Sequence, residues 1–284
     1  MLKQFIKTPL RYPGGKSRAL KAIEENLPRT FSEFREPFVG GGSVFIFIRQ
    51  KFPQVRVWIN DLNFDLFCFW KESQKDINQL VSEIKRIKET EKDGHALFKR
   101  MVEAGEKKLS DFERAARFFV LNRITFSGTV DAGGYSEGAF KGRFTDSSIE
   151  RLCKMKEILD GVKITNHDYK DVLTAKGKDV FIFLDPPYMT ATKSRLYGKR
   201  GNLHTTFNHK EFAEEVFKCQ HDWLITYDDS QEIRENFTFA NIKAWELQYG
   251  MNNYKQETAE KGKELFISNY ALNEEQPQQM TMLF

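Results

Sequence analysis

An uninterrupted apolar run, Val180–Leu184, is followed at once by the residues DPPY, and this feature constrains the fold most strongly. A short run without alternating polar residues predicts a strand that is buried on both faces, as in a parallel sheet covered by helices. The two prolines fix their backbone φ angles, so Asp185 and Tyr188 are held in a stiff turn. Because ligands bind at the carboxyl ends of strands in open α/β sheets, we expect a functional site at this turn.

Further short strands are expected towards both ends of the chain. The apolar patterns predict strands over 34–39, 55–59, 162–165 and 223–227, and a helix over 43–51. Two more stretches, 242–248 and 264–270, are expected to pair antiparallel at one edge of the sheet. Strands that alternate with helices are typical of a mostly parallel sheet with helices on both faces, so the predicted fold class is α/β.

The middle of the chain, residues 66–158, has a helical pattern instead. Apolar residues recur at helical spacing over 77–87. Ser110 and Glu113 have the spacing of a capping box, which predicts a helix start. The stretch 126–144 is rich in glycine and aromatic residues and predicts a long loop or hairpin. We therefore expect a helical insert with a glycine-rich arm at 66–158, set into an α/β domain made of residues 1–65 and 159–284.

The sequence EPFVGGGSVF, residues 36–45, indicates a glycine turn between a strand and a helix. Glycine permits positive φ angles and lets a ligand approach the backbone closely. No GK[ST] follows, which excludes a P-loop, and Phe45 occupies the third glycine position of a dinucleotide fingerprint. Asp61 ends the next strand, where an acid hydrogen-bonds ribose hydroxyls. Together they indicate an adenosine-type cofactor, the alternatives being a turn without a ligand and a surface aspartate.

The composition of the DPPY turn indicates a binding site for an amino group. A carboxylate and a peptide carbonyl can both accept hydrogens from one amine, and the ring of Tyr188 can stack on a flat base. The alternative is a structural proline turn with an incidental acid at Asp185. A further stretch, TPLRYPGGKSR at 8–18, combines an aromatic residue, a Pro-Gly-Gly bend and a lysine ahead of a helix.

Composition excludes several classes of protein. No apolar run approaches the roughly 20 residues that span a bilayer, and the first residues lack the apolar stretch of a signal peptide, so we expect a cytoplasmic protein. The three cysteines lack CxxC spacing and the five histidines lack HExxH spacing, which argues against a disulfide framework and against a metal. A net charge of +4 and a pI of about 8.7 are compatible with a polyanionic partner.

The combination of motifs resembles the Dam-like adenine-N6 DNA methyltransferases, in the group whose cofactor motif precedes its catalytic motif. The motifs occur in the family's order over nearly the whole chain, and they are RYPGGK (11–16), EPFVGGGSVF (36–45), NDLNFDL (60–66), LNR (121–123), NHDY (166–169) and DPPY (185–188). The resemblance implies a Rossmann-like S-adenosylmethionine-dependent methyltransferase fold. It also implies that the helical insert is a target-recognition subdomain.

The resemblance implies S-adenosylmethionine as the cofactor. Lys16 would lie close to its methionine carboxylate, Asp61 would take the ribose hydroxyls and Asp168 would lie near the adenine. The residues that the resemblance assigns to the cofactor are Tyr12, Lys16, Glu36, Phe38, Gly40, Gly42, Asp61, Asp168 and Asp185.

The implied reaction transfers a methyl group to the exocyclic amine of an adenine flipped out of duplex DNA. Asp185 would be the catalytic carboxylate, Pro186 would belong to the catalytic turn and Tyr188 would be the stacking ring. The adenine amine is a poor nucleophile because its lone pair is delocalised, and acceptors for its hydrogens favour a tetrahedral nitrogen. Flipping costs a few kcal/mol and stacking returns about 1–3 kcal/mol, so DNA contacts must supply the rest.

Basic residues near these motifs are the expected DNA contacts. The basic residues after the DPPY turn are expected to contact phosphates, the alternative being a solvated loop; they are Lys193, Arg195, Lys199 and Arg200. The basic residues of the insert are expected to take part in base reading; they are Arg123, Lys141 and Arg143. The arm sequence TVDAGGYSEGAF lacks the polar run of GATC-reading family members, so the resemblance gives no recognition sequence. The stretch ITYDDS, 225–230, stands where the family has a motif that helps to form the base pocket.

The implied partners are double-stranded DNA and, if the protein belongs to a restriction–modification system, a cognate restriction endonuclease. Two alternatives to this function come from the same residues. The first is a methyltransferase that acts on RNA or on cytosine amino groups, because the turn chemistry suits any planar amine. The second is a nucleic-acid-binding protein that keeps the methyltransferase scaffold without turnover.

Overall fold

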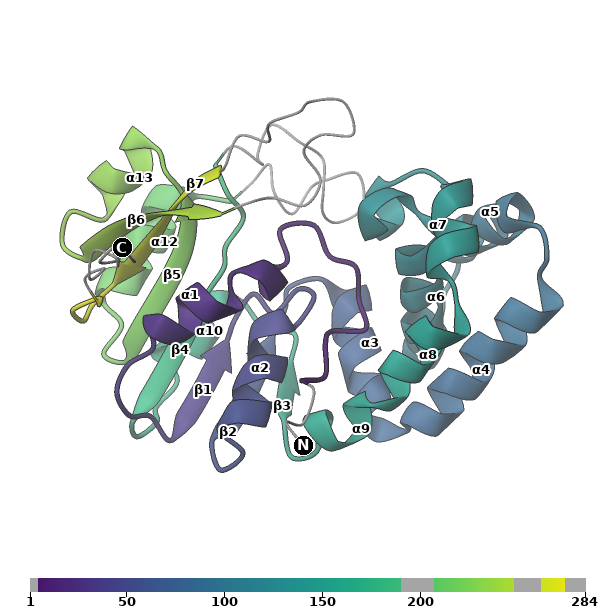
Figure 1. The fold of residues 1–284 in the computed structure, drawn as a ribbon, viewed down its shortest axis with the longest axis horizontal. Coiled ribbons are helices and arrows are strands. Elements are labelled where there is room, and N and C mark those ends of the chain that lie inside the picture. The colour runs from purple at the N-terminus through teal and green to yellow at the C-terminus, as the bar shows by residue number, and fades with distance from the viewer. Residues whose placement is uncertain (1–4, 190–206, 248–261, 274–284) are drawn as a thin grey trace, which may run out of the picture.

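The computed structural model describes residues 5–189, 207–247 and 262–273 of the chain. Its centre is a seven-stranded sheet with the order β3-β2-β1-β4-β5-β7-β6. The first five strands in this order are parallel, whereas β7 runs antiparallel to both β5 and β6 (Figure 1). The predicted α/β class and the antiparallel pair at the edge are confirmed. Within the described residues no helix has the length and apolar character that a membrane crossing requires.

The strands agree with the apolar patterns to within a few residues. Their bounds are β1 Glu33–Glu36, β2 Arg56–Asn60, β3 Lys163–Thr165, β4 Val180–Leu184, β5 Asp222–Asp228, β6 Asn241–Leu247 and β7 Gly262–Ser268. The first strand ends at Glu36 and not at the predicted residue 39. Pro37 explains the early end, because a proline has no N–H to donate to a neighbouring strand.

Strand β4 shows why the sequence carries an unbroken apolar run. Phe181 and Phe183 belong to the core on one face of the sheet, and Val180, Ile182 and Leu184 belong to the core on the other. Successive side chains of a strand point to opposite faces, so both faces of β4 are covered. The strand lies between β1 and β5, at the centre of the sheet.

Helices cover both faces of the sheet and also form a separate helical part. Helices α1 and α2 pack on one face, and α10, α12 and α13 pack on the other. Their bounds are α1 Leu20–Glu25, α2 Ser43–Lys51, α10 Tyr169–Thr174, α12 His209–Phe217 and α13 Gln231–Asn236. Helix α2 has the predicted bounds, and the residue before it, Gly42, is in the left-handed conformation with a φ of 73°.

Seven helices, α3 to α9, follow β2 and lie on the β3 side of the molecule (Figure 1). Ser110 and Glu113 form the predicted capping box at the start of α6. The long aromatic face of α6 packs on α3, with the rings of Phe69 and Phe119 stacked 6.0 Å apart. The bounds are α3 Phe64–Lys75, α4 Ile77–Thr90, α5 Gly94–Ala104, α6 Asp111–Ile124, α7 Glu137–Arg143, α8 Asp146–Cys153 and α9 Met155–Leu159.

The glycine-rich stretch 126–144 is a loop only in its first part, whereas its composition predicts a long loop or hairpin throughout. It begins with two short 3₁₀ turns, 126–128 and 130–132, and then forms helix α7. Ser136 starts this helix because its side chain accepts a hydrogen bond from the Ala139 N–H. Only an isolated bridge between Thr125 and Tyr135 is strand-like among the described residues here. Glycine content alone therefore misled the prediction, since a good N-cap outweighed it.

Candidate active site

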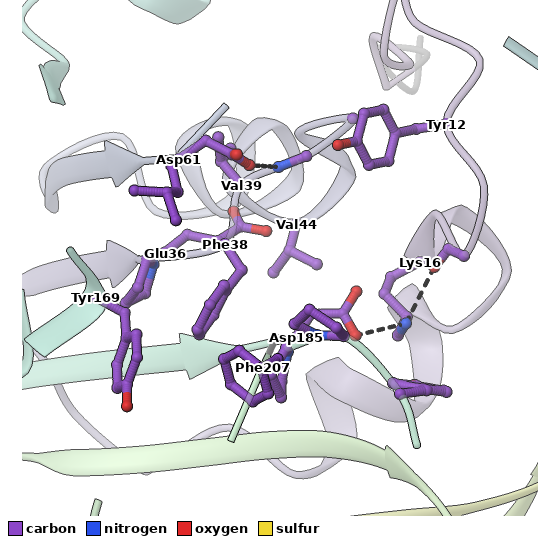
Figure 2. A pocket seen from close by; sticks show the side chains of 18 of the residues that line it. Tyr12, Lys16, Glu36, Phe38, Val39, Val44, Asp61, Tyr169, Asp185 and Phe207 are labelled. Carbon is purple, nitrogen blue, oxygen red and sulfur yellow. Dashed lines mark hydrogen bonds and ion pairs between the residues drawn. The ribbon is translucent and has the colours of Figure 1, made fainter. Parts of the chain in front are cut away.

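A cavity of about 940 Å³ opens where β1, β2 and β4 end (Figure 2). All three strands are parallel, so their carboxyl ends meet at one edge of the sheet, and β1 is flanked by β2 and β4. The cavity is lined by all the residues predicted for the cofactor and for catalysis, namely Tyr12, Lys16, Glu36, Phe38, Gly40, Gly42, Asp61, Asp168, Asp185, Pro186 and Tyr188. The glycine turn and the DPPY turn therefore face one space.

The glycine turn is shaped around the ring of Tyr12. Gly40 has a φ of 45°, in the left-handed region that favours glycine. A Cβ atom at this position would lie 2.8 Å from the Tyr12 ring, and one at Gly41 would lie 2.7 Å from the Tyr12 Cβ. Glycine at these positions thus lets the N-terminal segment pack directly on the turn.

Asp61 closes the far side of the same turn. Its Oδ2 accepts a 3.0 Å hydrogen bond from the Gly40 N–H, and its Oδ1 accepts a 2.9 Å hydrogen bond from the Asn63 N–H. Burial raises the pKa of Asp61 to about 6, while these two backbone bonds oppose the shift. The carboxyl is therefore fixed in place at the cavity wall, where its remaining lone pairs can accept hydroxyl hydrogens.

Glu36 gives the cavity a second buried carboxyl. It is on the α2 face of β1, and its Oε2 accepts a 2.9 Å hydrogen bond from the Phe45 N–H. Burial raises the pKa of Glu36 well above its usual range, and the charges of Asp185 and Asp61 raise it further. An added positive charge would stabilise this arrangement of acids.

Asp185 is held by two donors through the same oxygen. Lys16 Nζ lies 2.7 Å from Asp185 Oδ1, and the Thr226 hydroxyl donates to this oxygen over 2.9 Å. Lys16 also donates to the Gly14 carbonyl over 3.0 Å. Figure 2 shows the other oxygen of Asp185 turned away from Lys16. The carboxylate is thus oriented by one oxygen, which leaves its second oxygen to meet a substrate.

Tyr188 stands beside this pair. Its hydroxyl donates a 3.1 Å hydrogen bond to Glu264 Oε2, and Lys16 Nζ lies 4.8 Å from the centre of its ring. Burial raises the pKa of Tyr188 well above its usual range, with the charges of Asp185 and Glu264 adding to the shift. The phenol therefore stays neutral, and its ring is available as an apolar surface.

An aromatic cluster lines the other end of the cavity. The rings of Phe38 and Tyr169 are 5.5 Å apart at 30°, and Phe207 lies 5.9 Å from Phe38 and 6.0 Å from Tyr169. Asp168 lies next to this cluster, where its side chain caps α10 by accepting from the Lys170 N–H. Flat aromatic rings beside hydrogen-bonding groups suit a planar heterocycle.

Four residues of the site were not singled out individually from the sequence. Tyr169 and Phe207 line the cavity, while Thr226 and Glu264 lie fully buried behind the catalytic turn. Thr226 falls inside ITYDDS, the stretch expected to help form the base pocket. A signal also existed for Glu264, because a charged residue on the buried face of an apolar strand is rare unless it is paired.

The predicted DNA contacts fall into three groups. Lys141 and Arg143 are exposed on α7, where Lys141 Nζ pairs with Glu137 over 2.8 Å. The four basic residues after the DPPY turn lie outside the described residues and are Lys193, Arg195, Lys199 and Arg200. The third group is Arg123, whose position does not fit the prediction.

Arg123 is buried and does not reach the surface as a DNA contact should. Its side chain is 4% exposed, donates to the Pro9 carbonyl and packs on the Phe119 ring at 5.4 Å. Burial, together with the neighbouring charges of Arg151, Arg11 and Arg143, lowers its pKa to about 9. In this structure Arg123 therefore ties helix α6 to the N-terminal segment.

Asn122 makes the same connection more tightly. Its Oδ1 accepts a 2.9 Å hydrogen bond from the Arg11 N–H, and its Nδ2 donates to the Arg11 carbonyl over 2.6 Å. Figure 1 shows the N-terminal segment running between the sheet and the helical part. Asn122 of the LNR motif thus anchors the N-terminal segment that carries Tyr12 and Lys16.

The cavity fits S-adenosylmethionine by its charge and its shape. Among the described residues that line it, the only buried cation is Lys16, against seven acidic residues: Glu36, Asp61, Asp168, Asp185, Glu211, Asp228 and Asp229. A positively charged ligand compensates such an excess of acids. The aromatic cluster suits an adenine ring, and the fixed carboxyl of Asp61 suits ribose hydroxyls.

Comparisons with known proteins agree with this chemistry. A family model described as D12 class N6 adenine-specific DNA methyltransferase matches residues 12–251. The Type II methyltransferase M.MjaIII of Methanocaldococcus jannaschii is 29% identical over 208 residues, which cover 66% of this chain and 71% of that protein. The Type II methyltransferase M1.LlaDCHI of Lactococcus lactis subsp. cremoris is 24% identical and covers 92% of this chain and 94% of its own length.

A third relative is a DNA adenine methylase. The DNA adenine methylase of Haemophilus influenzae is 25% identical over 253 residues, which cover 84% of this chain and 85% of that protein. The family match spans both the glycine turn and the DPPY turn that line the cavity. This chain belongs to the D12 class of N6 adenine-specific DNA methyltransferases.

Proposed function

We propose that the protein methylates the N6 amine of an adenine that is flipped out of a specific site in duplex DNA, with S-adenosylmethionine as the methyl donor. The observation that carries the proposal is the shared cavity of the glycine turn and the DPPY turn. Asp185 and Gly40 line it from the ends of neighbouring parallel strands. A methyl donor on one turn can therefore meet an acceptor on the other.

Residues of this chain divide the binding of the cofactor between them. Asp61 accepts hydrogens from the ribose, the cluster of Phe38 and Tyr169 holds the adenine with Asp168 nearby, and Tyr12 packs at the glycine turn. When bound, S-adenosylmethionine supplies a methyl group on a positively charged sulfur, so the reaction needs no metal or covalent enzyme intermediate. The excess of carboxyls from Glu36 and its neighbours stabilises that charge in the cavity.

Asp185 orients and activates the target amine. Its Oδ1 is held by Lys16 and Thr226, so the second oxygen accepts a hydrogen from the adenine N6. A carbonyl of the turn that contains Pro186 accepts the other hydrogen. Together they favour a tetrahedral nitrogen whose lone pair is available, which is electrostatic stabilisation combined with positioning. The surplus proton leaves after transfer, so Asp185 does not need to be a strong base.

Tyr188 and the DNA-binding surface bring the base to the cavity. Stacking on the Tyr188 ring offsets part of the cost of flipping, which is a few kcal/mol. Exposed Lys141 and Arg143 on α7 are proposed DNA contacts, together with the basic stretch 193–200. We assign cofactor binding and catalysis to residues 1–65 and 159–284, and target recognition to the insert at 66–158.

The test is methyl transfer to DNA by the purified protein. Unmethylated bacteriophage DNA is incubated with labelled S-adenosylmethionine, digested, and analysed for N6-methyldeoxyadenosine by nucleoside mass spectrometry. We expect the wild type to form this product and Asp185→Asn to lose it while keeping cofactor affinity in calorimetry. Asp171→Asn is the matched control, because Asp171 lies outside the cavity lining.

Two outcomes contradict the proposal. Full activity of the Asp185→Asn variant overturns the catalytic assignment. Label found only in RNA or only in cytosine overturns the substrate and supports the alternative acceptors. The family match to adenine-specific DNA enzymes weighs against those acceptors and against a scaffold without turnover.

The biological setting follows from the substrate. Duplex DNA as the partner is consistent with action in the cytoplasm. Relatives named as Type II methyltransferases support pairing with a cognate restriction endonuclease. Expression of this chain in cells that carry such an endonuclease, followed by measurement of DNA cleavage, tests that pairing.

A further inference from the structure

Glu264 is a fully buried carboxyl directly behind the proposed stacking ring. It lies on β7 opposite Asp228 of β5, has no exposed surface, and accepts the Tyr188 hydroxyl hydrogen at Oε2 over 3.1 Å. Glu264 is not among the residues that line the cavity. A carboxyl removed from water is costly unless it is paired, so packing alone does not account for an acid here.

The groups that face Glu264 come from each neighbouring element. Burial has the largest effect and raises the pKa of Glu264 to about 7. Lys16 and the Tyr188 hydrogen bond oppose this shift, whereas the charges of Asp185 and Asp228 add to it. The ammonium of Lys16 also lies 4.8 Å from the centre of the Tyr188 ring. Glu264 thus interacts electrostatically with Lys16 and Asp185, although it does not line the cavity.

The ring of Tyr188 is fixed at one end by the chain and at the other end by Glu264. The proline turn at 186–187 limits the backbone, but the side chain keeps two rotatable bonds. The hydrogen bond from the hydroxyl fixes the position of its oxygen and so restricts the first rotation, χ1. The oxygen lies on the axis of the second rotation, χ2, so the hydrogen bond orients the ring plane through the preference of the phenol O–H bond to lie in the plane of the ring. A flat ring held in this way presents one defined face, and the entropy of ordering it is lost before the base arrives.

We propose that Glu264 is a positioning residue that fixes the plane of the Tyr188 ring for stacking by the flipped adenine, through the hydrogen bond from the Tyr188 hydroxyl. This inference rests on the proposed roles of Asp185 and Tyr188. It extends the site to β7 and explains why the stacking residue is a tyrosine, since phenylalanine would provide the same face without the anchor.

The test is a double-mutant cycle between Tyr188→Phe and Glu264→Leu. At pH 8, kcat and KM are measured on unmethylated bacteriophage DNA with labelled S-adenosylmethionine, and calorimetry gives the affinity for the cofactor. We expect each single variant to lower kcat about tenfold and the double variant to be no slower, because both changes remove one interaction. Cofactor affinity should stay within about twofold, and Glu264→Gln, which keeps an acceptor oxygen, should restore most of kcat.

A purely structural role for Glu264 would give a different pattern. If the two losses multiply to about a hundredfold, or if Glu264→Leu retains kcat within about twofold of the wild type, the inference is wrong. Where the leucine variant does not fold, Glu264→Asp replaces it, because the shorter side chain withdraws the acceptor from the hydroxyl. Glu72→Gln on α3 is the control for a buried glutamate away from the site and should leave kcat unchanged.

The outcome also separates this inference from the proposed function. A wild-type protein that transfers no methyl group to DNA would overturn the proposed function and remove the basis of the inference with it. An active wild type with independent effects of Tyr188 and Glu264 would overturn the inference alone.

Discussion

Lys16 and Asp185 form an ion pair of 2.7 Å that joins the N-terminal segment to the carboxyl end of β4. Lys16 is 4% exposed and Asp185 is 21% exposed, so water screens this pair only weakly. The charge of Lys16 also lowers the pKa values of Glu36 and Glu264, against the larger effect of burial. One buried ammonium therefore offsets several carboxyls at the place where the target amine is expected.

Replacement of Lys16 by methionine should destabilise the protein by about 3 kcal/mol at pH 8, because it leaves buried carboxylates without a cation. Urea denaturation measures the change, and Lys75→Met, which alters an exposed lysine paired with Glu72, should cost far less. An unchanged midpoint for Lys16→Met would show that the pair does not contribute to the fold. The variant should also lose methyl transfer, because Lys16 and Thr226 both hold Asp185 Oδ1 and only Thr226 would remain.

A methyl group at Gly40 should weaken the cofactor site. Gly40→Ala combines strain at a φ of 45° with a Cβ that lies 2.8 Å from the Tyr12 ring, so we expect at least a tenfold loss of cofactor affinity. Gly161→Ala is the matched control, because Gly161 has a φ of 67° with open space around its Cβ position. The control should lose about 1 kcal/mol of stability and no affinity. Equal affinities for both variants would contradict the packing role of the turn.

Cofactor affinity should depend on pH through Asp61. Burial raises the pKa of this carboxyl to about 6, so it is mostly ionised at pH 7 and mostly protonated at pH 5. If only the ionised form binds the ribose well, the dissociation constant should rise about tenfold between these pH values. Calorimetry checks this, and Asp61→Asn should bind weakly with no change over the same range. A flat profile for the wild type would exclude Asp61 as the titrating group.

Glu264 should make the fold less stable at alkaline pH. Its pKa is about 7 in the folded protein, above the usual 4.5, so the folded state holds the proton more tightly and stability is lost as pH rises from 4.5 through 7. Glu264→Gln removes this loss and should exceed the wild type in unfolding free energy at pH 8 by up to about 3 kcal/mol. The difference should vanish near pH 4.5 in denaturant titrations. A constant difference across this range would mean that Lys16, Asp185, Asp228 and Tyr188 already compensate the charge.

Arg143 should contribute to DNA affinity without affecting the cofactor. It is exposed on α7, and Arg143→Ala should weaken binding of any DNA sequence and lower the salt dependence of binding by about one counterion. Lys141 is already paired with Glu137, so Lys141→Ala should change both quantities less. Fluorescence anisotropy at several salt concentrations measures these slopes. Identical slopes for the wild type and Arg143→Ala would remove α7 from the DNA surface.

The sequence was most informative where a local pattern determines local structure. The apolar run of β4, the capping box at Ser110 and the start of α2 all depend on neighbouring residues, and each lies where it was predicted. The catalytic turn at Asp185 and the glycine turn at Gly40 could be brought together because parallel strands end at one edge of a sheet.

Long-range pairing explains what the sequence did not reveal. Whether an arginine is a surface contact or a buried tie depends on what packs over it, and for Arg123 that is a segment more than a hundred positions earlier. The partnership of Tyr188 with Glu264 depends on which strand lies beside β5, which no local pattern specifies. Glycines in the stretch 126–144 suggested a loop, but the cap at Ser136 determined a helix.

The two hydrogen bonds between Asn122 and the backbone of Arg11 have a consequence for protein engineering. The insert enters the chain between β2 and β3, so it looks like a cassette that could be exchanged to redirect the enzyme to other DNA sequences. Yet the N-terminal segment that carries Tyr12 and Lys16 is hydrogen-bonded to that insert through Asn122. An exchanged insert without Asn122 would no longer hold the N-terminal segment at the cofactor site. A chimaera built in this way would recognise its new target and leave it unmethylated.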